Sequence, residues 1–186
     1  MTFTETAIKG VWVIESKAYA DDRGYFMESF KQNEFEKHIG KINFIQDNES
    51  KSVYGVLRGL HYQLPPYEQA KLVRVIKGEA LDIAVDIRQN SPTFGKHIAI
   101  ILSEENKRQI FVPRGMAHGF LVLSKEVVFT YKVDNVYAPQ AERAIRYDDP
   151  DLKIEWTVSA EKLILSEKDK GAPAFKDVKF KNSDFL

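Results

Sequence analysis

The chain has 186 residues, 44% of them apolar and 12% aromatic, which is enough for one substantial core but short for two independent domains. Its 27 basic and 27 acidic residues balance, which argues against a protein that gathers nucleic acid or anionic membrane through its overall charge. The absence of cysteine excludes a disulfide framework, a thiolate metal site and a cysteine nucleophile. We therefore expect a single domain over residues 1–186.

The chain shows no targeting or membrane-spanning pattern. Its first residues lack a basic start followed by an apolar run, and no apolar stretch approaches the roughly 18 residues of a membrane span. We therefore expect a soluble, cytoplasmic protein with no membrane or nucleic-acid partner.

Helical patterning is weak and confined to the flanks. The best short candidate is 33–39, where Phe35 and Ile39 are spaced to share a face. A turn is expected at 159–165, and the last dozen residues turn polar and are expected to lie over the surface.

Strand patterning dominates the middle of the chain. Residues 70–88 read as strand, turn and strand, and the alternation of Leu81, Ile83 and Val85 with polar or small residues predicts that one face of the second strand is buried. Further strands are expected at 97–102, 109–112, 119–123 and 127–133. Short strands at nearly regular spacing predict a β-sandwich or barrel.

A first polar cluster lies at 57–63, where Arg58 and His61 flank Gly59, with Lys71 following at the start of the next strand. Strict alternation in a strand points Arg58 and His61 to opposite faces, so spacing alone does not place both in one cavity. A bulge at Gly59 would bring them to the same side.

A second cluster places His118 between two glycines, where backbone can approach a ligand closely, and Tyr131 follows on the next predicted strand. A third charged cluster, at 166–169, contains Asp169 as a candidate partner for a histidine. A lone histidine in a β protein is more often structural than catalytic, and we interpret His38 and His97 in that way.

Metal and cofactor chemistry are disfavoured. His61 and His118 lie far apart, without the close spacing that sets two metal ligands on one strand or helix. No phosphate-loop or dinucleotide-binding pattern opens a helix. We expect no metal and no cofactor.

Several sequence blocks together are specific. They are Asp22-Arg23-Gly24-Tyr25-Phe26-Met27-Glu28, Gln46-Asp47-Asn48, Leu57-Arg58-Gly59-Leu60-His61-Tyr62-Gln63, Ser91-Pro92-Thr93-Phe94-Gly95, Ala117-His118-Gly119-Phe120 and Lys168-Asp169. In this order, from about residue 10 to about residue 173, the chain resembles the dTDP-4-dehydrorhamnose 3,5-epimerase family. The resemblance implies an all-β, cupin-like double-stranded β-helix (jelly roll) with short flanking helices, used without a metal.

The resemblance also implies the reaction: conversion of dTDP-4-dehydro-6-deoxy-D-glucose to dTDP-4-dehydro-L-rhamnose, in dTDP-L-rhamnose biosynthesis. Carbons 3 and 5 both flank the C4 ketone, so each can be inverted by removing a proton and returning one from the opposite face. By resemblance, His61 is the base, Asp169 orients it, Lys71 stabilises the enolate and Tyr131 donates the proton. Substrate contacts are implied for Arg23, Glu28, Gln46, Asn48, Arg58, His118, Glu142 and Lys168.

Relatives with this fold form dimers, so the resemblance implies a homodimer in which an N-terminal strand crosses to the partner and carries Arg23 and Glu28 to the partner's site. Three alternatives stay open: an epimerase that inverts only C3 or C5, a 3,4-ketoisomerase, and a non-catalytic cupin that binds a sugar nucleotide or a metal. The polar extension from about Lys176 to Leu186 has no assigned role.

Overall fold

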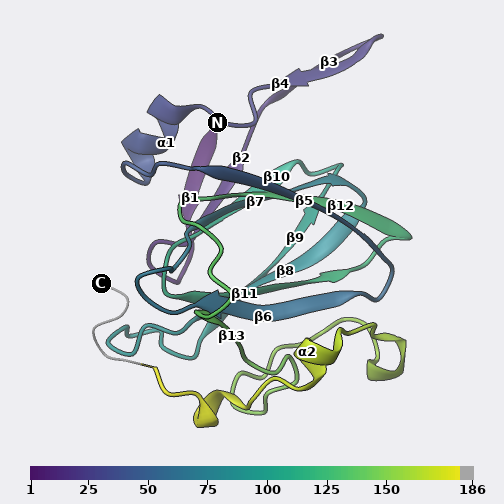
Figure 1. Cartoon of the computed structure of the whole chain (residues 1–186). Coiled ribbons are helices and arrows are strands. Elements are labelled where there is room, and N and C mark those ends of the chain that lie inside the picture. The colour runs from purple at the N-terminus through teal and green to yellow at the C-terminus, as the bar shows by residue number, and fades with distance from the viewer. Residues whose placement is uncertain (181–186) are drawn as a thin grey trace.

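A computed structural model describes residues 1–180 of the chain, and two antiparallel sheets dominate it (Figure 1). The six-stranded sheet has the order β1 (Thr2–Glu5), β2 (Trp12–Glu15), β10 (Arg108–Val112), β7 (Lys71–Lys77), β12 (Glu126–Val133) and β5 (Gln46–Val53). The five-stranded sheet has the order β13 (Glu142–Ala144), β6 (Leu57–Gln63), β11 (Met116–Val122), β8 (Glu79–Asp86) and β9 (His97–Ser103).

The remaining elements are short and lie outside the two sheets. A separate hairpin of β3 (Ala18–Asp21) and β4 (Gly24–Met27) projects from the body (Figure 1). The helices are α1 (Gln32–His38), α2 (Glu167–Lys170) and two 3-10 turns, η1 (Ala160–Lys162) and η2 (Phe175–Asp177). The predicted cupin-like jelly roll with short flanking helices is confirmed. Among residues 1–180, no helix has the length and apolar character needed to cross a membrane.

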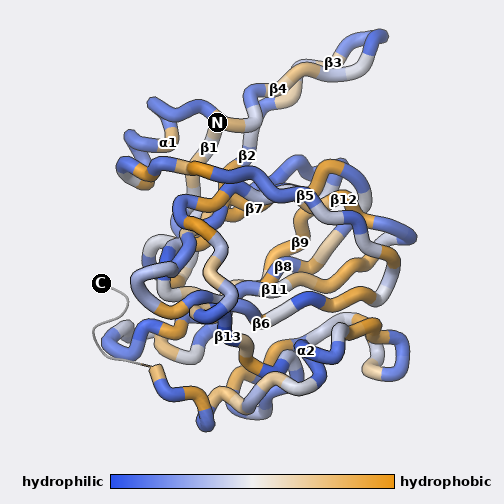
Figure 2. The backbone as a smooth tube through the Cα atoms, viewed as in Figure 1, coloured by the Kyte–Doolittle hydropathy of each residue, from blue (hydrophilic) through white to orange (hydrophobic). Residues whose placement is uncertain are grey.

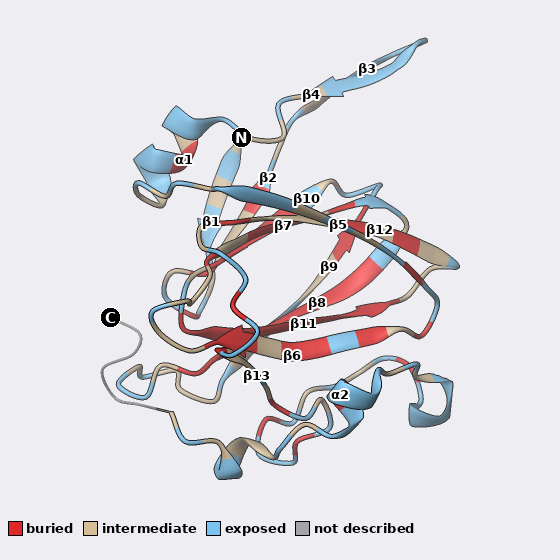
Figure 3. Ribbon diagram, viewed as in Figure 1, coloured by how far each residue is buried: buried red, intermediate tan, exposed pale blue. Residues whose placement is uncertain are grey.

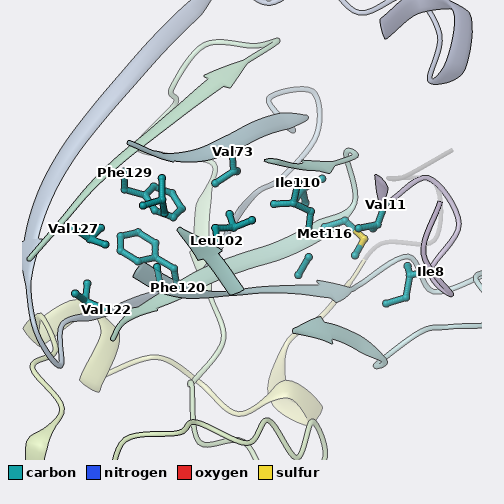
Figure 4. Packing of buried hydrophobic residues seen from close by; sticks show 14 residues of the cluster. Ile8, Val11, Val73, Leu102, Ile110, Met116, Phe120, Val122, Val127 and Phe129 are labelled. Carbon is teal, nitrogen blue, oxygen red and sulfur yellow. The ribbon is translucent and has the colours of Figure 1, made fainter. Parts of the chain in front are cut away.

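Apolar side chains from both sheets meet in the space between them (Figure 4). Figure 2 shows hydrophobic residues along strands of both sheets. Phe120 on β11 stacks on Phe129 on β12 with ring centroids 3.9 Å apart, so an aromatic pair joins the two sheets. Burial of this apolar area is the main term that stabilises the fold. The core holds the strands that carry the polar residues described below in fixed positions.

The prediction that only one face of β8 is buried was wrong. All residues of β8 from Ala80 to Asp86 are buried (Figure 3). Ala80 and Ala84 face the core between the two sheets, here called the inner core. Leu81, Ile83 and Val85 belong to a second apolar cluster that includes Leu152 and Val158 from the C-terminal segment. The C-terminal segment therefore covers the outer face of the five-stranded sheet, which short-range alternation does not reveal.

A bulge in β6 brings Arg58 and His61 to the same face. His61 is opposite His118 in β11, while Arg58 is opposite Phe120, so two residues of β6 stand against Gly119. Gly59 has a φ of +135°, and a Cβ on it would lie 2.6 Å from Cα of Gly119. The backbone that approaches Gly119 closely is thus that of β6. Strand β11 begins at Met116, three residues before the strand predicted from the sequence.

The polar C-terminal extension packs on the body as far as it is described. Phe180 has ring centroids 5.4 Å from Phe175 and 5.6 Å from Phe94. Residues 181–186, the rest of the predicted polar extension, lie outside the described part.

Candidate active site

Residues from both sheets line one pocket near the edge of the inner core, here called the inner pocket. His61 and Gln63 come from the five-stranded sheet, and Lys71 and Tyr131 from the six-stranded sheet; Tyr137 and Glu142 also line it. Lys71 shares a strand face with the core residues Val73 and Val75. The cavity measures about 110 Å³, below the roughly 300–1,000 Å³ usual for a ligand pocket.

The carboxylate of Asp169, which was predicted to pair with a histidine, lies against the imidazole of His61. Nε2 of His61 lies 2.5 Å from Oδ1 of Asp169. Ser166 caps α2 by accepting from the Asp169 N–H, and its hydroxyl donates to Asp169 Oδ2 at 2.7 Å. Burial alone would raise the pKa of Asp169, but the bonds to His61 and Ser166 outweigh it and the net shift is downward. Asp169 is therefore held as an anion against the imidazole.

Lys71 and Tyr131 lie together on the opposite sheet. The Nζ of Lys71 is 5.9 Å from the centroid of the Tyr131 ring. Burial lowers the pKa of Lys71 to about 8, against an opposing effect of Asp82 and Glu142. Burial raises the pKa of Tyr131, although Arg58 nearby opposes the shift. At neutral pH the pocket thus holds a mostly protonated amine beside a neutral phenol.

Glu142 joins three parts of the chain at the edge of the pocket. It forms an ion pair with Lys168, and it accepts a hydrogen bond of 2.7 Å from the hydroxyl of Tyr137. Burial would raise the pKa of Glu142, yet Lys168, Tyr137 and His61 together lower it. Since Lys168 and Asp169 are neighbours in α2, this short helix fixes both Glu142 and His61. Tyr137 was missed in the sequence because a lone tyrosine in a loop carries no distinguishing signal.

The side chain of His118 is buried. Its side chain is 7% exposed, and its Nε2 is 3.0 Å from Oδ2 of the fully buried Asp82. Asp82 was not predicted to have a role, because it alternates with apolar residues of β8 and therefore looked like a solvent-facing position. The substrate contact of His118 stays a prediction.

Three further residues with predicted contacts, Arg58, Gln46 and Asn48, are not among those that line the inner pocket. Arg58 donates to the buried Ser52 hydroxyl at 3.1 and 3.2 Å. Gln46 donates to Asn48 at 2.7 Å, and Asn48 is opposite Tyr131 in the β5–β12 ladder. Because directly opposed residues share a sheet face, Asn48 faces the same interior as Tyr131.

Arg23 and Glu28 are not brought to the inner pocket. The side chain of Arg23 is 89% exposed and bonded to Asp21 within the hairpin, and Glu28 pairs with Lys31. Their roles in substrate binding stay predictions.

A metal site and a larger hollow are the alternatives to the inner pocket. Within residues 1–180, no group of three or more His, Cys, Asp or Glu side chains is arranged to hold a metal ion. A larger hollow of about 340 Å³ lies beside Phe30 and Arg74. His61 and Lys71 do not line it, so the inner pocket is the better candidate for proton chemistry.

The family model for dTDP-4-dehydrorhamnose 3,5-epimerase matches residues 5–177. The chain belongs to this family. It is 51% identical over 181 residues to the dTDP-4-dehydrorhamnose 3,5-epimerase of Shigella flexneri, covering 97% of this chain and 99% of that one. The family is one of isomerases, and the predicted relationship is confirmed.

Solved structures agree with this assignment. The crystal structure of the epimerase from Elizabethkingia anophelis superposes with a TM-score of 0.93 at 49% identity, covering 97% of this chain and 99% of that one. The Legionella pneumophila enzyme, solved in complex with dTDP-4-keto-L-rhamnose, gives 0.92 at 47% identity, with coverage of 96% and 94%. The family members thus share the jelly roll observed here.

Proposed function

We propose that the inner pocket epimerises dTDP-4-dehydro-6-deoxy-D-glucose at C3 and C5 to give dTDP-4-dehydro-L-rhamnose, without a metal or cofactor. One observation carries this proposal: a histidine on one sheet faces the pocket opposite a tyrosine and a lysine on the other. Inversion needs a base on one side of the sugar ring and an acid on the other. A sugar held between the sheets meets both.

In this proposal His61 is the base. Asp169 occupies Nε2, which leaves Nδ1 to take the proton from carbon, and the anion stabilises the imidazolium that forms. The same orienting logic operates in catalytic triads, where loss of the carboxylate is costly. Removal of the proton breaks the C–H bond and leaves its electron pair as an enolate on the former ketone.

Lys71 and Tyr131 complete the step from the opposite sheet. The Lys71 ammonium stabilises charge on the enolate oxygen, and this attraction is stronger in a partly dry site than in water. Tyr131 delivers its hydroxyl proton to the other face of the carbon. Each inversion puts one proton on His61 and takes one from Tyr131, so both groups must exchange protons with solvent before the next inversion.

Substrate binding extends beyond the inner pocket. Its volume suits at most the reacting sugar, so the nucleotide must lie along the surrounding wall. Arginine forks suit a pyrophosphate, and amides suit sugar hydroxyls or the base. We assign these contacts to the predicted set: Arg58, Gln46, Asn48, His118, Glu142 and Lys168 within one chain, and Arg23 and Glu28 from a partner.

We further propose a homodimer that exchanges the β3–β4 hairpin. The hairpin projects from the body (Figure 1) and exposes Tyr19, Tyr25 and Phe26 at 59%, 52% and 68%. Such an apolar group on a projecting element suits burial against a second copy. A single domain over residues 1–186 and a cytoplasmic location complete the proposal.

The decisive assay incubates the protein with dTDP-4-dehydro-6-deoxy-D-glucose, with and without a chelator, and identifies the product by NMR. We expect the L-rhamno product in both cases. Inversion at one carbon would indicate a single-site epimerase, and a ketone moved to C3 would indicate a ketoisomerase. An unchanged sugar, with a tightly bound metal in the protein, would support the non-catalytic cupin instead.

A further inference from the structure

Gln63 is a buried amide that ties two loops together beside the inner pocket. It is 6% exposed and lies two residues after His61 on β6, so both side chains point to the same face. Its Nε2 donates to the carbonyls of Tyr67 at 2.5 Å and Val136 at 3.1 Å, and its Oε1 accepts from the Ala138 N–H at 2.7 Å. One side chain therefore joins the loop after β6 to the loop before β13.

Tyr137 lies between the two residues that Gln63 holds in the second loop. Its hydroxyl donates to Glu142, which is directly opposite Gln63 in the β13–β6 ladder. The cross-strand pair of Gln63 and Glu142 thus fixes Tyr137 at the backbone on both sides and at the hydroxyl. A loop tyrosine that is 55% exposed ordinarily rotates freely, but this one is held at three points against the pocket.

We infer that Gln63 is a positioning residue for the epimerisation: with Glu142 it holds Tyr137 as a wall of the inner pocket, and this wall keeps the sugar between His61 and Tyr131. The inference rests on the proposed function. Abstraction and return of a proton both need the reacting carbon near contact distance from base and acid, and small misplacements reduce the rate strongly. A wall that moves lets the sugar sit away from either group.

A purely structural role is the alternative for Gln63, because buried amides commonly serve only to satisfy backbone groups. Gln109 provides the matched control. It is 3% exposed and donates to the Ser29 carbonyl at 2.7 Å, on the other side of the six-stranded sheet from the inner pocket. Gln63→Met and Gln109→Met each remove a buried amide, so both should lower the melting temperature.

The test compares kcat/KM for the wild type, Gln63→Met, Gln109→Met, Tyr137→Ala and the Gln63→Met/Tyr137→Ala double variant, measured on folded protein. We expect Gln63→Met and Tyr137→Ala each to lose about 10- to 100-fold, and Gln109→Met to stay near wild type. If Gln63 acts through Tyr137, the double variant should be little worse than the poorer single variant.

Two results would overturn the inference: a kcat/KM for Tyr137→Ala within twofold of wild type, or a double variant whose loss equals the product of the two single losses. Tyr137 is largely exposed, so Tyr137→Ala should fold, and it can overturn the inference even if Gln63→Met does not fold. An inactive wild type would instead count against the proposed function, and with it this role for Gln63.

Discussion

Nε2 of His61 lies 2.5 Å from Oδ1 of Asp169, although 108 residues separate them in the chain. The contact forms because the cap of α2 fixes Asp169 while the bulge in β6 turns His61 toward the interior.

The first prediction concerns the base. His61→Ala should lower kcat by about 10²- to 10⁴-fold, the usual contribution of a general base. Asp169→Asn should also lower kcat, because an amide does not stabilise the imidazolium as an anion does. Steady-state kinetics on both variants, with circular dichroism to confirm folding, provide the measurement. Near-normal turnover by His61→Ala removes His61 from this role.

The second prediction concerns Lys71, whose pKa is lowered to about 8 from the usual 10.5. If the ammonium is required, kcat/KM should fall as the pH rises through about 8. Between pH 8 and 10.5 the unfolded chain binds more protons than the folded one, so this group makes stability rise with pH in that window.

Lys71→Met removes this ammonium altogether. Removing a charge that burial disfavours should raise the unfolding free energy at pH 7 by on the order of 1–3 kcal/mol, while kcat falls by about 10²- to 10³-fold. Denaturant titration and kinetics on one preparation measure both. A variant that is both less stable and fully active contradicts the assignment.

The third prediction concerns the bulge. Gly59→Ala should destabilise the fold strongly, because the added Cβ would meet Cα of Gly119 at 2.6 Å while φ is +135°. Gly40→Ala is the control, since Gly40 has a φ of +115° with nothing within 4 Å. Its cost should be the backbone strain alone, about 1–3 kcal/mol. Equal unfolding free energies for the two variants would show that the contact with Gly119 does not matter.

The fourth prediction concerns hairpin exchange. If Arg23 serves the partner's site, His61→Ala and Arg23→Ala chains should each be poorly active alone but regain activity when refolded together. A mixed dimer then has one site with an intact His61 and an intact Arg23, giving about a quarter of wild-type activity at equal mixing. No regain, or a wild-type monomer by light scattering with full turnover, contradicts the exchange.

Local patterns predicted much of the fold. The strand–turn–strand over 70–88 corresponds to β7 and β8, and the helix expected at 33–39 is α1, shifted by one residue. Such elements follow from side-chain periodicity. Burial of both faces of β8 did not follow, because the segment that covers its outer face lies more than 60 residues away in the chain.

The candidate site, like the fold, could be predicted only in part. The predicted residues His61, Lys71, Tyr131 and Glu142 line one pocket. They could be predicted because long sequence blocks identified the family. Asp82 and Tyr137 were missed: a carboxylate within an apolar strand looks exposed, and the partner of Asp82 is 36 residues away. Neither feature follows from spacing, since both depend on how distant strands meet.

The most direct test of the account runs the reaction in deuterated water with wild type and Tyr131→Phe, following label and stereochemistry at C3 and C5 by NMR. We predict that wild type inverts both carbons and places solvent deuterium on each. Tyr131→Phe should lose inversion, because His61 can still remove a proton and return it only to the same face. Inversion without deuterium in wild type, or full inversion by Tyr131→Phe, would contradict proton removal by His61 and proton donation by Tyr131.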